Sequence, residues 1–465
     1  MNVMNDNQKI ASQLNRSVGL VGATAMVVGS VIGMGIYALI SKVGQEVGAA
    51  IWMPFTLSMV IMVFSVIPFI QIGAALPRAG ATYVYCSRLI HPLLGTIVSF
   101  TLIFTIICSM AFLSIGLSGY IQGYLPFDLS INTLSMLCPT LFLMVYLFFS
   151  FRFVTMLQVF FTILSLAALF IYGIFGMTSI DISISTNLPG GIGSLLKTSI
   201  LCYTAWFGLT ILVEIGEEIK KAKRNIPLAL LIGSLIILVS YIVISIVFVN
   251  SVSLDREKMA AMAAPLIDSG RIFLPPMLVV FLLIGAGAAA LSSFNAASIA
   301  VPREILALAR DGIIPQYFMN LSLRTNAPSN ATIATFVLLF ILLGVGQCFD
   351  YSIDLYASLA AQGLLLVSIF IAFAALRLPR KFPDYYADAY FKIPRKIMLI
   401  IVCLCFFSCG GLFVLMLINL PITVVYLSGI LVFSTVLYYS RVRFLKAKGF
   451  NFQECISRIP GYDEE

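Results

Sequence analysis

Long apolar runs with almost no charge recur along the whole chain, and they constrain the fold more than any single motif. A helix needs roughly 20 apolar residues to cross the hydrocarbon core of a bilayer. Twelve runs have about that length, and we expect each to form a helix. They cover residues 18–40, 47–75, 93–125, 132–150, 153–176, 195–215, 228–250, 272–300, 331–347, 352–376, 397–418 and 422–440. The sequence predicts an all-α polytopic membrane protein with twelve transmembrane helices.

Composition excludes a soluble globular protein. The chain has 465 residues, of which 60% are hydrophobic and 10% are charged, whereas soluble domains carry roughly 25% charged residues. A soluble core could not bury this much apolar surface, so most of it must face lipid. The first run shows no cleavage signature, and we expect it to be a retained helix rather than a signal peptide.

The net charge of +8 orients the chain and gives no reason to expect a nucleic-acid partner. Five of the 28 Lys and Arg lie on one predicted side of the membrane, and the other 23 lie on the opposite side. The five are Lys42, Lys197, Arg256, Lys258 and Arg271. Because cytoplasmic loops are enriched in basic residues, this bias predicts that both termini are cytoplasmic.

The runs divide into two groups of five, followed by a final pair. The first group starts from the cytoplasm and the second from outside, which is the pattern of an inverted repeat. The predicted organisation is an N-terminal tail 1–17, a first repeat 18–176, a second repeat 195–376, a cytoplasmic loop 377–396, a final pair 397–440 and a C-terminal tail 441–465. The outer loop 251–271 is expected to hold a short helix.

Glycines interrupt the first run in the stretch GSVIGMGIYAL, residues 29–39. Gly29 and Gly33 form a GxxxG pattern, which allows close helix packing. Gly33, Gly35 and Ala38 also match a dinucleotide fingerprint, but the strand–turn–helix unit which that motif requires is missing. A third interpretation is an unwound helix. Its free amides and helix dipole would bind an anionic group without a cationic side chain, and such backbone is tolerated in a membrane where it lines a cavity.

The second repeat carries a corresponding feature, CYTAWFGLT at 202–210, with aromatic residues and Gly208 near the centre of its first helix. Broken helices at matching positions of two inverted halves are the best sequence indicator of a transport site.

Four stretches together resemble the amino acid–polyamine–organocation (APC) superfamily of transporters. They are GSVIGMGI in the first run, ALPRAGATYVY at 75–85, EEIKKAKRNIP at 217–227 and REILALARDGIIP at 303–315. The resemblance spans more than 300 residues. It implies a five-plus-five inverted repeat, the LeuT-like fold, with broken helices one and six.

The resemblance also implies a substrate site at mid-membrane. Backbone amides of helix one would hold the α-carboxylate of an amino acid, at Ser30, Val31, Ile32, Gly33, Met34 and Gly35. Carbonyls of helices one and six would meet the α-amino group, the latter around Tyr203, Thr204, Ala205, Trp206, Phe207 and Gly208. Trp206 and Phe207 are candidate lids. Ser109 and Phe112 of helix three match pocket positions, and Asn295 of helix eight is expected to line the same pocket.

The coupling mechanism is left open by the sequence. Many relatives carry a lysine in helix five, and the alignment places Ser165 at that position, which argues against the simplest lysine-based proton mechanism. Ser292 and Ser293 in helix eight could supply hydroxyl ligands to a sodium ion, or could be small residues that pack helices. Glu214 is either a buried group that carries a proton or a solvated carboxylate paired with Lys220 or Lys221.

The favoured function is secondary active transport by alternating access, in a cell membrane such as the bacterial inner membrane. The predicted pocket residues are uncharged, which favours a neutral amino acid. A cationic amino acid or a polyamine stays open, because Trp206 and Phe207 could bind a cation. A non-transporting sensor and a membrane enzyme are disfavoured, since the tails are short and the spans contain no catalytic constellation. We expect no cofactor, and the nine cysteines give no firm metal site. The candidate coupling ion is H⁺ or Na⁺. The sequence leaves open whether the protein forms a homo-oligomer.

Overall fold

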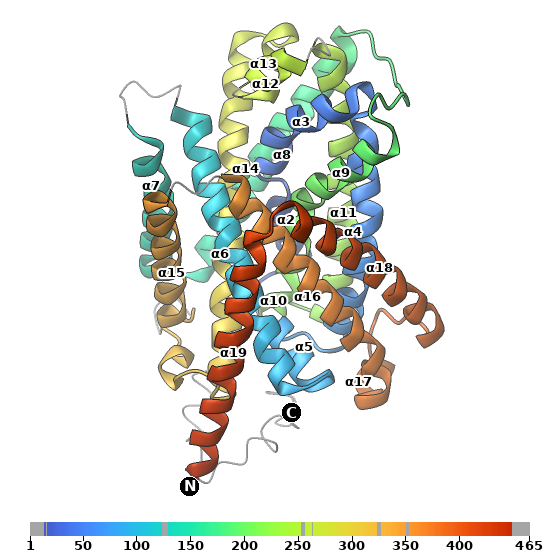
Figure 1. Ribbon diagram of the computed structural model, residues 1–465. Helices are drawn as coiled ribbons and strands as arrows, with labels where there is room; N and C mark the ends of the chain where they lie inside the picture. Colours follow the sequence, from blue (N-terminus) through green and yellow to red (C-terminus); the bar gives the residue numbers. More distant parts are fainter. Residues whose placement is uncertain are drawn as a thin grey trace.

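The computed structural model is a bundle of long helices (Figure 1). It describes residue 14 and residues 16–122, 129–252, 256–262, 264–322, 327–349 and 353–448. Within these ranges, twelve helices are long and apolar enough to cross a membrane. The predicted class and the predicted number of spans are therefore confirmed.

The spans follow the predicted runs closely. Those of the first repeat are α2 (Leu20–Val31) continued by α3 (Met34–Val47), α4 (Trp52–Ala75), α6 (Pro92–Gln122), α7 (Ile131–Phe148) and α8 (Phe151–Ser179). Those of the second repeat are α9 (Gly191–Tyr203) continued by η2 (Thr204–Thr210) and α10 (Ile211–Glu214), α11 (Ala222–Ser251), α14 (Pro276–Arg310), α15 (Ser329–Cys348) and α16 (Ile353–Lys381). The final pair is α18 (Arg395–Asn419) and α19 (Ile422–Ala447).

Short helices connect the spans at both ends of the bundle. The outer loop contains two of them, α12 (Arg256–Ala261) and α13 (Pro265–Phe273), where the sequence predicted one. At the opposite end lie α5 (Ala81–Leu89) and α17 (Pro383–Ala387) (Figure 1). The remaining short elements are η1 (Gly48–Ala50), η3 (Gly216–Glu218) and η4 (Gln316–Met319).

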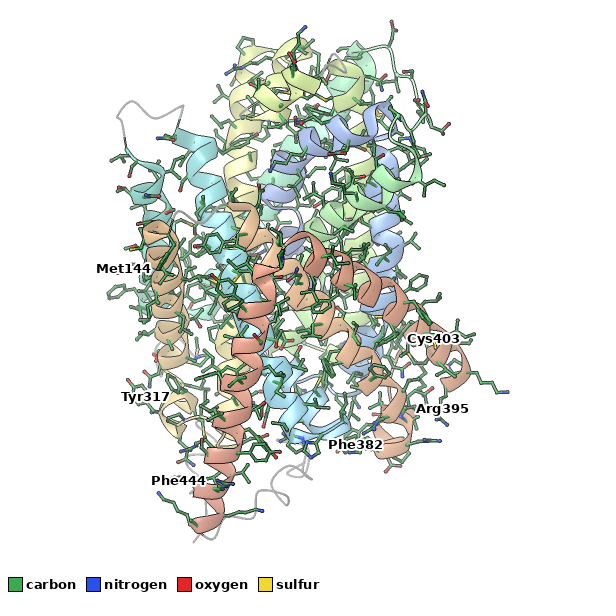
Figure 2. All side chains as sticks on the ribbon, viewed as in Figure 1. Met144, Tyr317, Phe382, Arg395, Cys403 and Phe444 are labelled. Carbon is green, nitrogen blue, oxygen red and sulfur yellow. The ribbon has the colours of Figure 1, made fainter. Side chains whose placement is uncertain are left out.

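The helices differ strongly in how much of their surface faces protein. In the most apolar stretch of α6, 78% of the residues are buried, against 17% in α19. Large apolar side chains are exposed on the outer helices, as with Met144 on α7, and Figure 2 shows Met144 and Cys403 at the periphery of the bundle. Apolar side chains in this position suit contact with lipid. The core of the bundle is accordingly formed by α2, α6, α14 and α16, in which α14 packs on α2 and α6, and α6 packs on α16.

Candidate functional site

Helix one is interrupted at Ile32 and Gly33. Ile32 has φ −73° and ψ 87°, and Gly33 is extended with φ −125° and ψ −151°. The gap is shorter than the sequence suggested, because Met34 and Gly35 already belong to α3. The first amides of a helix have no partner within that helix, and no side chain caps the start of α3. The interruption therefore presents hydrogen-bond donors at the positive end of a 14-residue helix.

Helix six changes its winding instead of opening a gap. Residues Thr204–Thr210 form the 3-10 segment η2 between α9 and α10. Within it, Gly208 lies against the backbone of helix one, since a Cβ at this position would lie 2.3 Å from the carbonyl group of Ser30. The Ser30 hydroxyl donates to the Gly208 carbonyl oxygen at 2.9 Å. The two irregular segments are thus in direct contact.

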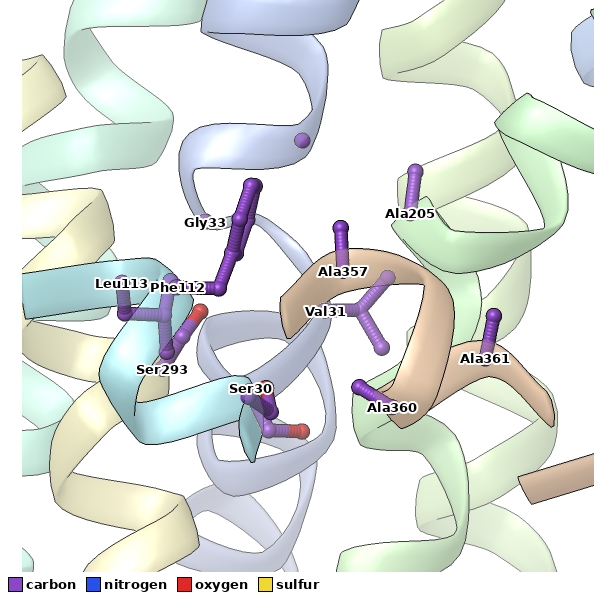
Figure 3. Close-up of a pocket in the computed structure, with 12 residues that line it drawn as sticks. Ser30, Val31, Gly33, Phe112, Leu113, Ala205, Ser293, Ala357, Ala360 and Ala361 are labelled. Carbon is purple, nitrogen blue, oxygen red and sulfur yellow. The ribbon is translucent and has the colours of Figure 1, made fainter. Parts of the chain in front are cut away.

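A cavity lies beside the interruption of helix one (Figure 3). Its volume is about 50 Å³, several times the roughly 10–15 Å³ that a single water requires. Phe112, Leu113 and Ser293 lie on one side of Gly33, and Ala205 and the alanines of α16 lie on the other (Figure 3). The lining residues are Ser30, Val31, Gly33, Gly35, Ser109, Phe112, Leu113, Ala205, Ser293, Ala357, Ala360 and Ala361. None of them carries a charged side chain.

The structure brings eight of the predicted site residues to this cavity and leaves others away from it. Those that line it are Ser30, Val31, Gly33, Gly35, Ser109, Phe112, Ala205 and Ser293. Those outside its lining are Ile32, Ser165, Tyr203, Trp206, Gly208, Glu214, Ser292 and Asn295. The side chains of Met34, Thr204 and Phe207 lie outside the described residues. Leu113 and the three alanines of α16 were not predicted.

Trp206 faces away from the cavity. Its side chain is fully buried, and its indole N–H donates to the Ser58 hydroxyl on α4 at 2.9 Å. The ring packs against Tyr241 of α11 with 5.1 Å between centroids. A lid role for Trp206 stays a prediction, since it would require this hydrogen bond to break.

A network of polar side chains links α8 and α14 behind helix one. The Gln158 amide nitrogen donates to Ser292 Oγ at 2.8 Å, and Thr162 Oγ1 lies 3.1 Å from the same oxygen. Thr162 also donates to the Ala25 carbonyl oxygen of α2 at 3.0 Å. A Cβ at Gly29 would lie 2.1 Å from both hydroxyl oxygens, so only glycine lets α2 pack this closely. Glycine packing and helix interruption therefore coexist in one stretch.

The side-chain amide of Asn295 is hydrogen-bonded within the same network. Its amide nitrogen donates to Gln158 Oε1 at 2.8 Å, and its Oδ1 accepts a hydrogen bond from the Tyr146 hydroxyl at 2.8 Å. The Ser165 hydroxyl donates to the Thr162 carbonyl oxygen within α8. Gln158 and Thr162 are the helix-five side chains whose polar atoms contact Ser292 of α14 next to helix one. The sequence signal for Gln158 was its polar side-chain amide in an otherwise apolar span.

Tyr241 of α11 joins helices one and six. Its hydroxyl lies 3.1 Å from the Val31 carbonyl oxygen and 3.3 Å from the Ala205 carbonyl oxygen. The Val31 carbonyl oxygen also accepts from the Gly33 amide at 2.9 Å, and Tyr241 adds a second donor to it. The sequence analysis did not single out this residue, because one tyrosine in a membrane span resembles a packing residue.

Ion pairs join η3, α5 and α14 at the end of the bundle that carries α5. They are Arg303–Glu218 at 2.7 Å, Arg310–Glu217 at 2.9 Å, Arg78–Glu217 at 3.9 Å and Arg88–Asp311. Burial favours a higher pKa for the Glu217 carboxyl, but Arg310 and Arg78 outweigh it and hold this pKa below its usual value. For Glu218, burial dominates over Arg303 and raises the pKa. These contacts tie η3, α5 and α14 together at that end of the bundle.

Glu214 is buried at the end of α10 and is 1% exposed. Its hydrogen bonds go to Thr82, with 2.5 Å between the Thr82 hydroxyl and Glu214 Oε1. Lys220, which was a predicted partner, is exposed. The buried alternative for Glu214 is therefore the one that this structure contains.

An interrupted helix one, a cavity lined by uncharged residues and, within the described residues, twelve membrane-length helices define a multi-pass membrane protein with a small cavity at a broken helix. The family profile described as "Amino acid permease" matches residues 18–438. The chain therefore belongs to the amino acid permease family of the APC superfamily.

Known relatives agree with this assignment. The chain is 25% identical over 399 residues to "Cationic amino acid transporter 4, vacuolar" of Arabidopsis thaliana, covering 80% of this chain and 64% of that protein. It thus spans less than two thirds of that relative. It is 24% identical to an uncharacterized transporter of Mycobacterium tuberculosis, covering 70% and 73% of the two chains. It is 23% identical to the human cystine/glutamate transporter, covering 85% and 80%.

Proposed function

We propose that this protein is a secondary active transporter of neutral amino acids that works by alternating access. The observation that carries the proposal is the cavity at the interruption of helix one, which Gly33 and Gly35 at the start of α3 border and uncharged side chains line. The N-terminal amides of α3 would bind the substrate carboxylate, since helix N-termini attract anions. The carbonyls of Val31 and Ala205 would accept from an α-amino group in place of the Tyr241 hydroxyl that now contacts them.

The lining supports a substrate with a small or apolar side chain. Ala357, Ala360 and Ala361 leave room without offering a polar partner. A cationic amino acid is the second candidate, because the Arabidopsis relative is named a cationic amino acid transporter. Such a substrate would have to place its charge beyond the described lining, whereas a neutral substrate needs no further contact.

Sodium coupling through Ser292 and Ser293 is disfavoured. Ser292 Oγ accepts from the Gln158 amide, and Ser293 donates to the Gly29 carbonyl oxygen at 2.9 Å. A cation there would have to displace the Gln158 donor. We propose proton coupling or exchange of one amino acid for another, with the end that carries α5 in the cytoplasm because basic residues gather there.

Uptake into liposomes tests the proposal. The full chain is reconstituted, and labelled L-alanine, L-leucine and L-arginine are offered with and without internal amino acid and under Na⁺ or pH gradients. Uptake of L-alanine or L-leucine above L-arginine supports the neutral assignment, and the reverse supports the cationic one. Binding without uptake in every condition would indicate a sensor and refute transport.

Two variants test the site itself. Gly33→Val and Gly35→Val should abolish uptake, because a Cβ would lie 2.5 Å from Ser293 Oγ or 3.1 Å from Ala205 Cβ. Gly287→Val is the matched control, since no atom lies within 4 Å of a Cβ there. Wild-type uptake by both site variants would show that the cavity is not the substrate site.

A further inference from the structure

Two buried carboxyl groups meet at the start of α5. Glu214 comes from α10 at the end of helix six, and Glu304 comes from α14, which is helix eight. Their side chains are 1% and 0% exposed. They lie 90 residues apart in the sequence, so only the crossing of the two helices brings them together.

Each carboxyl accepts hydrogen bonds from neighbouring donors. The Thr82 hydroxyl and amide donate to Glu214 Oε1 and Oε2 at 2.5 and 3.4 Å. The Tyr83 amide donates to Glu304 Oε1 at 3.2 Å, and the Ser99 hydroxyl of α6 donates to Oε2. The first turn of α5 is therefore held by acids from two different transmembrane helices.

The two carboxyl groups are bound at adjacent residues of α5, Glu214 at Thr82 and Glu304 at the Tyr83 amide. Within the described residues, neither carboxyl group forms an ion pair with a Lys or Arg side chain. Two carboxylates that share a site cannot both ionise readily, and an unpaired buried carboxylate is strongly destabilising. Burial of both groups at neighbouring positions thus favours a bound proton.

Nearby basic side chains are engaged with other acids. Arg303 precedes Glu304 on α14, and its guanidinium donates to Glu218 Oε1. Arg310 binds Glu217, and Arg88 binds Asp311. The other titratable side chains on α5 are Tyr83, Tyr85 and Cys86, and the Tyr85 hydroxyl donates to the Leu76 carbonyl oxygen. Cys86 is fully buried one helical turn after Thr82, and this burial raises the pKa of its thiol.

The start of α5 is packed tightly against α14. Gly80 has φ +63°, in the left-handed region that favours glycine. A Cβ there would lie 2.4 Å from Ala307 Cβ and 2.6 Å from the Arg303 carbonyl oxygen. The Gly80 amide donates to the Glu214 carbonyl oxygen at 3.1 Å. Repulsion between Glu214 and Glu304 would therefore act directly on the packing of the start of α5 against α14.

We propose that Glu214 and Glu304 form a one-proton binding site that holds α5 against helices six and eight, and that loss of this proton to water releases α5 and opens that end of the bundle. Protonation favours the closed end and deprotonation favours the open end. The role of this site in transport rests on the proposed function, but proton binding and the movement of α5 do not.

Alkylation of Cys86 measures the movement without measuring transport. The other eight cysteines are replaced by serine or alanine, and the rate of reaction with N-ethylmaleimide is followed between pH 6 and 9. Thiolate formation alone gives a rate increase of about tenfold per pH unit. If opening is linked to the loss of one proton, the reaction rate rises by a further factor of at most about tenfold per pH unit. The rate should therefore rise by more than tenfold per unit, approaching about 100-fold.

Glu304→Gln and Glu214→Gln should reduce the slope to about tenfold per unit. In each variant an amide donor replaces the shared proton and cannot be released. Glu46→Gln is the control, because Glu46 is partly exposed and pairs with Lys197 at the other end. Equal slopes in the wild type, Glu304→Gln and Glu214→Gln would overturn the proposal.

Infrared spectroscopy of the wild type keeps the proposal testable if both variants fail to fold. A protonated carboxyl band must be present at pH 7 and must fall as the pH rises, and its absence at pH 7 would overturn the proposal. Transport without the steep Cys86 slope would reject this inference alone. A steep slope without uptake of any amino acid would reject the proposed function alone.

Discussion

Replacing Gly208 with alanine should separate helices one and six and reduce amino acid uptake sharply. A Cβ at Gly208 would lie 2.3 Å from the Ser30 carbonyl carbon and oxygen, whereas ordinary contact begins near 3.4 Å. The two backbones must therefore move apart by about 1.1 Å, the difference between these distances. Both partners belong to backbone, so no side-chain rotation can relieve the clash.

The magnitude follows from two contributions. Overpacking of a tight interior typically costs about 1–3 kcal/mol. The same displacement lengthens the hydrogen bond from Ser30 Oγ to the Gly208 oxygen, now 2.9 Å, beyond bonding range, which costs about 0.5–1.5 kcal/mol. Together they amount to about 1.5–4.5 kcal/mol, which corresponds to roughly a 10- to 2,000-fold lower population of the contacting state.

The assay is the initial rate of uptake into liposomes, using the labelled amino acid that the wild type takes up fastest. Thermal unfolding in detergent, measured on the same preparation, reports whether Gly208→Ala folds. Gly287→Ala is the matched control, because a Cβ there has no neighbour within 4 Å, and it should transport at the wild-type rate. A folded Gly208→Ala protein with wild-type rate and KM would refute the contact between helices one and six as a requirement for transport.

Three further predictions concern contacts that only the folded chain contains. Tyr241→Phe should lower the Tm, because the hydrogen bond from its hydroxyl to the Val31 and Ala205 carbonyls is lost at about 0.5–1.5 kcal/mol; an unchanged Tm would contradict this role. Gln158→Leu should lower the Tm by a similar free energy through its lost bonds to Ser292 and Asn295, whereas Gln347→Leu, with one long bond at an exposed site, should not. Glu217→Gln should destabilise the protein at pH 7, by less than the roughly 3–5 kcal/mol of a fully buried pair, since the Glu217 side chain is 13% exposed. The folded pKa of Glu217 is lowered, so its contribution to stability is present above the ordinary pKa of 4.5 and is lost as the pH falls below it. The Tm difference between Glu217→Gln and the wild type should therefore shrink on acidification. A constant difference would contradict the pairing.

Several features of the site could be predicted from the sequence because they depend on local preferences. Glycine is a poor helix former, and the stretch with three glycines contains the interruption, although the gap is confined to Ile32 and Gly33. Ser109 and Phe112 were placed by resemblance and line the cavity. Trp206 shows the limit of this reasoning, since its position in helix six is as expected while its indole points toward Ser58.

The sequence by itself determined the membrane class, the twelve spans and the uncharged character of the cavity. These follow from hydropathy and from the rule that lipid-exposed backbone must be helical, and both act within one segment at a time. Only the tertiary structure decided which polar groups meet: Tyr241 with the carbonyls of helices one and six, Gln158 with Ser292, and Glu214 with Thr82. Helix crossings between segments 36 to 210 residues apart set these contacts, and the burial of polar groups away from water makes each of them consequential.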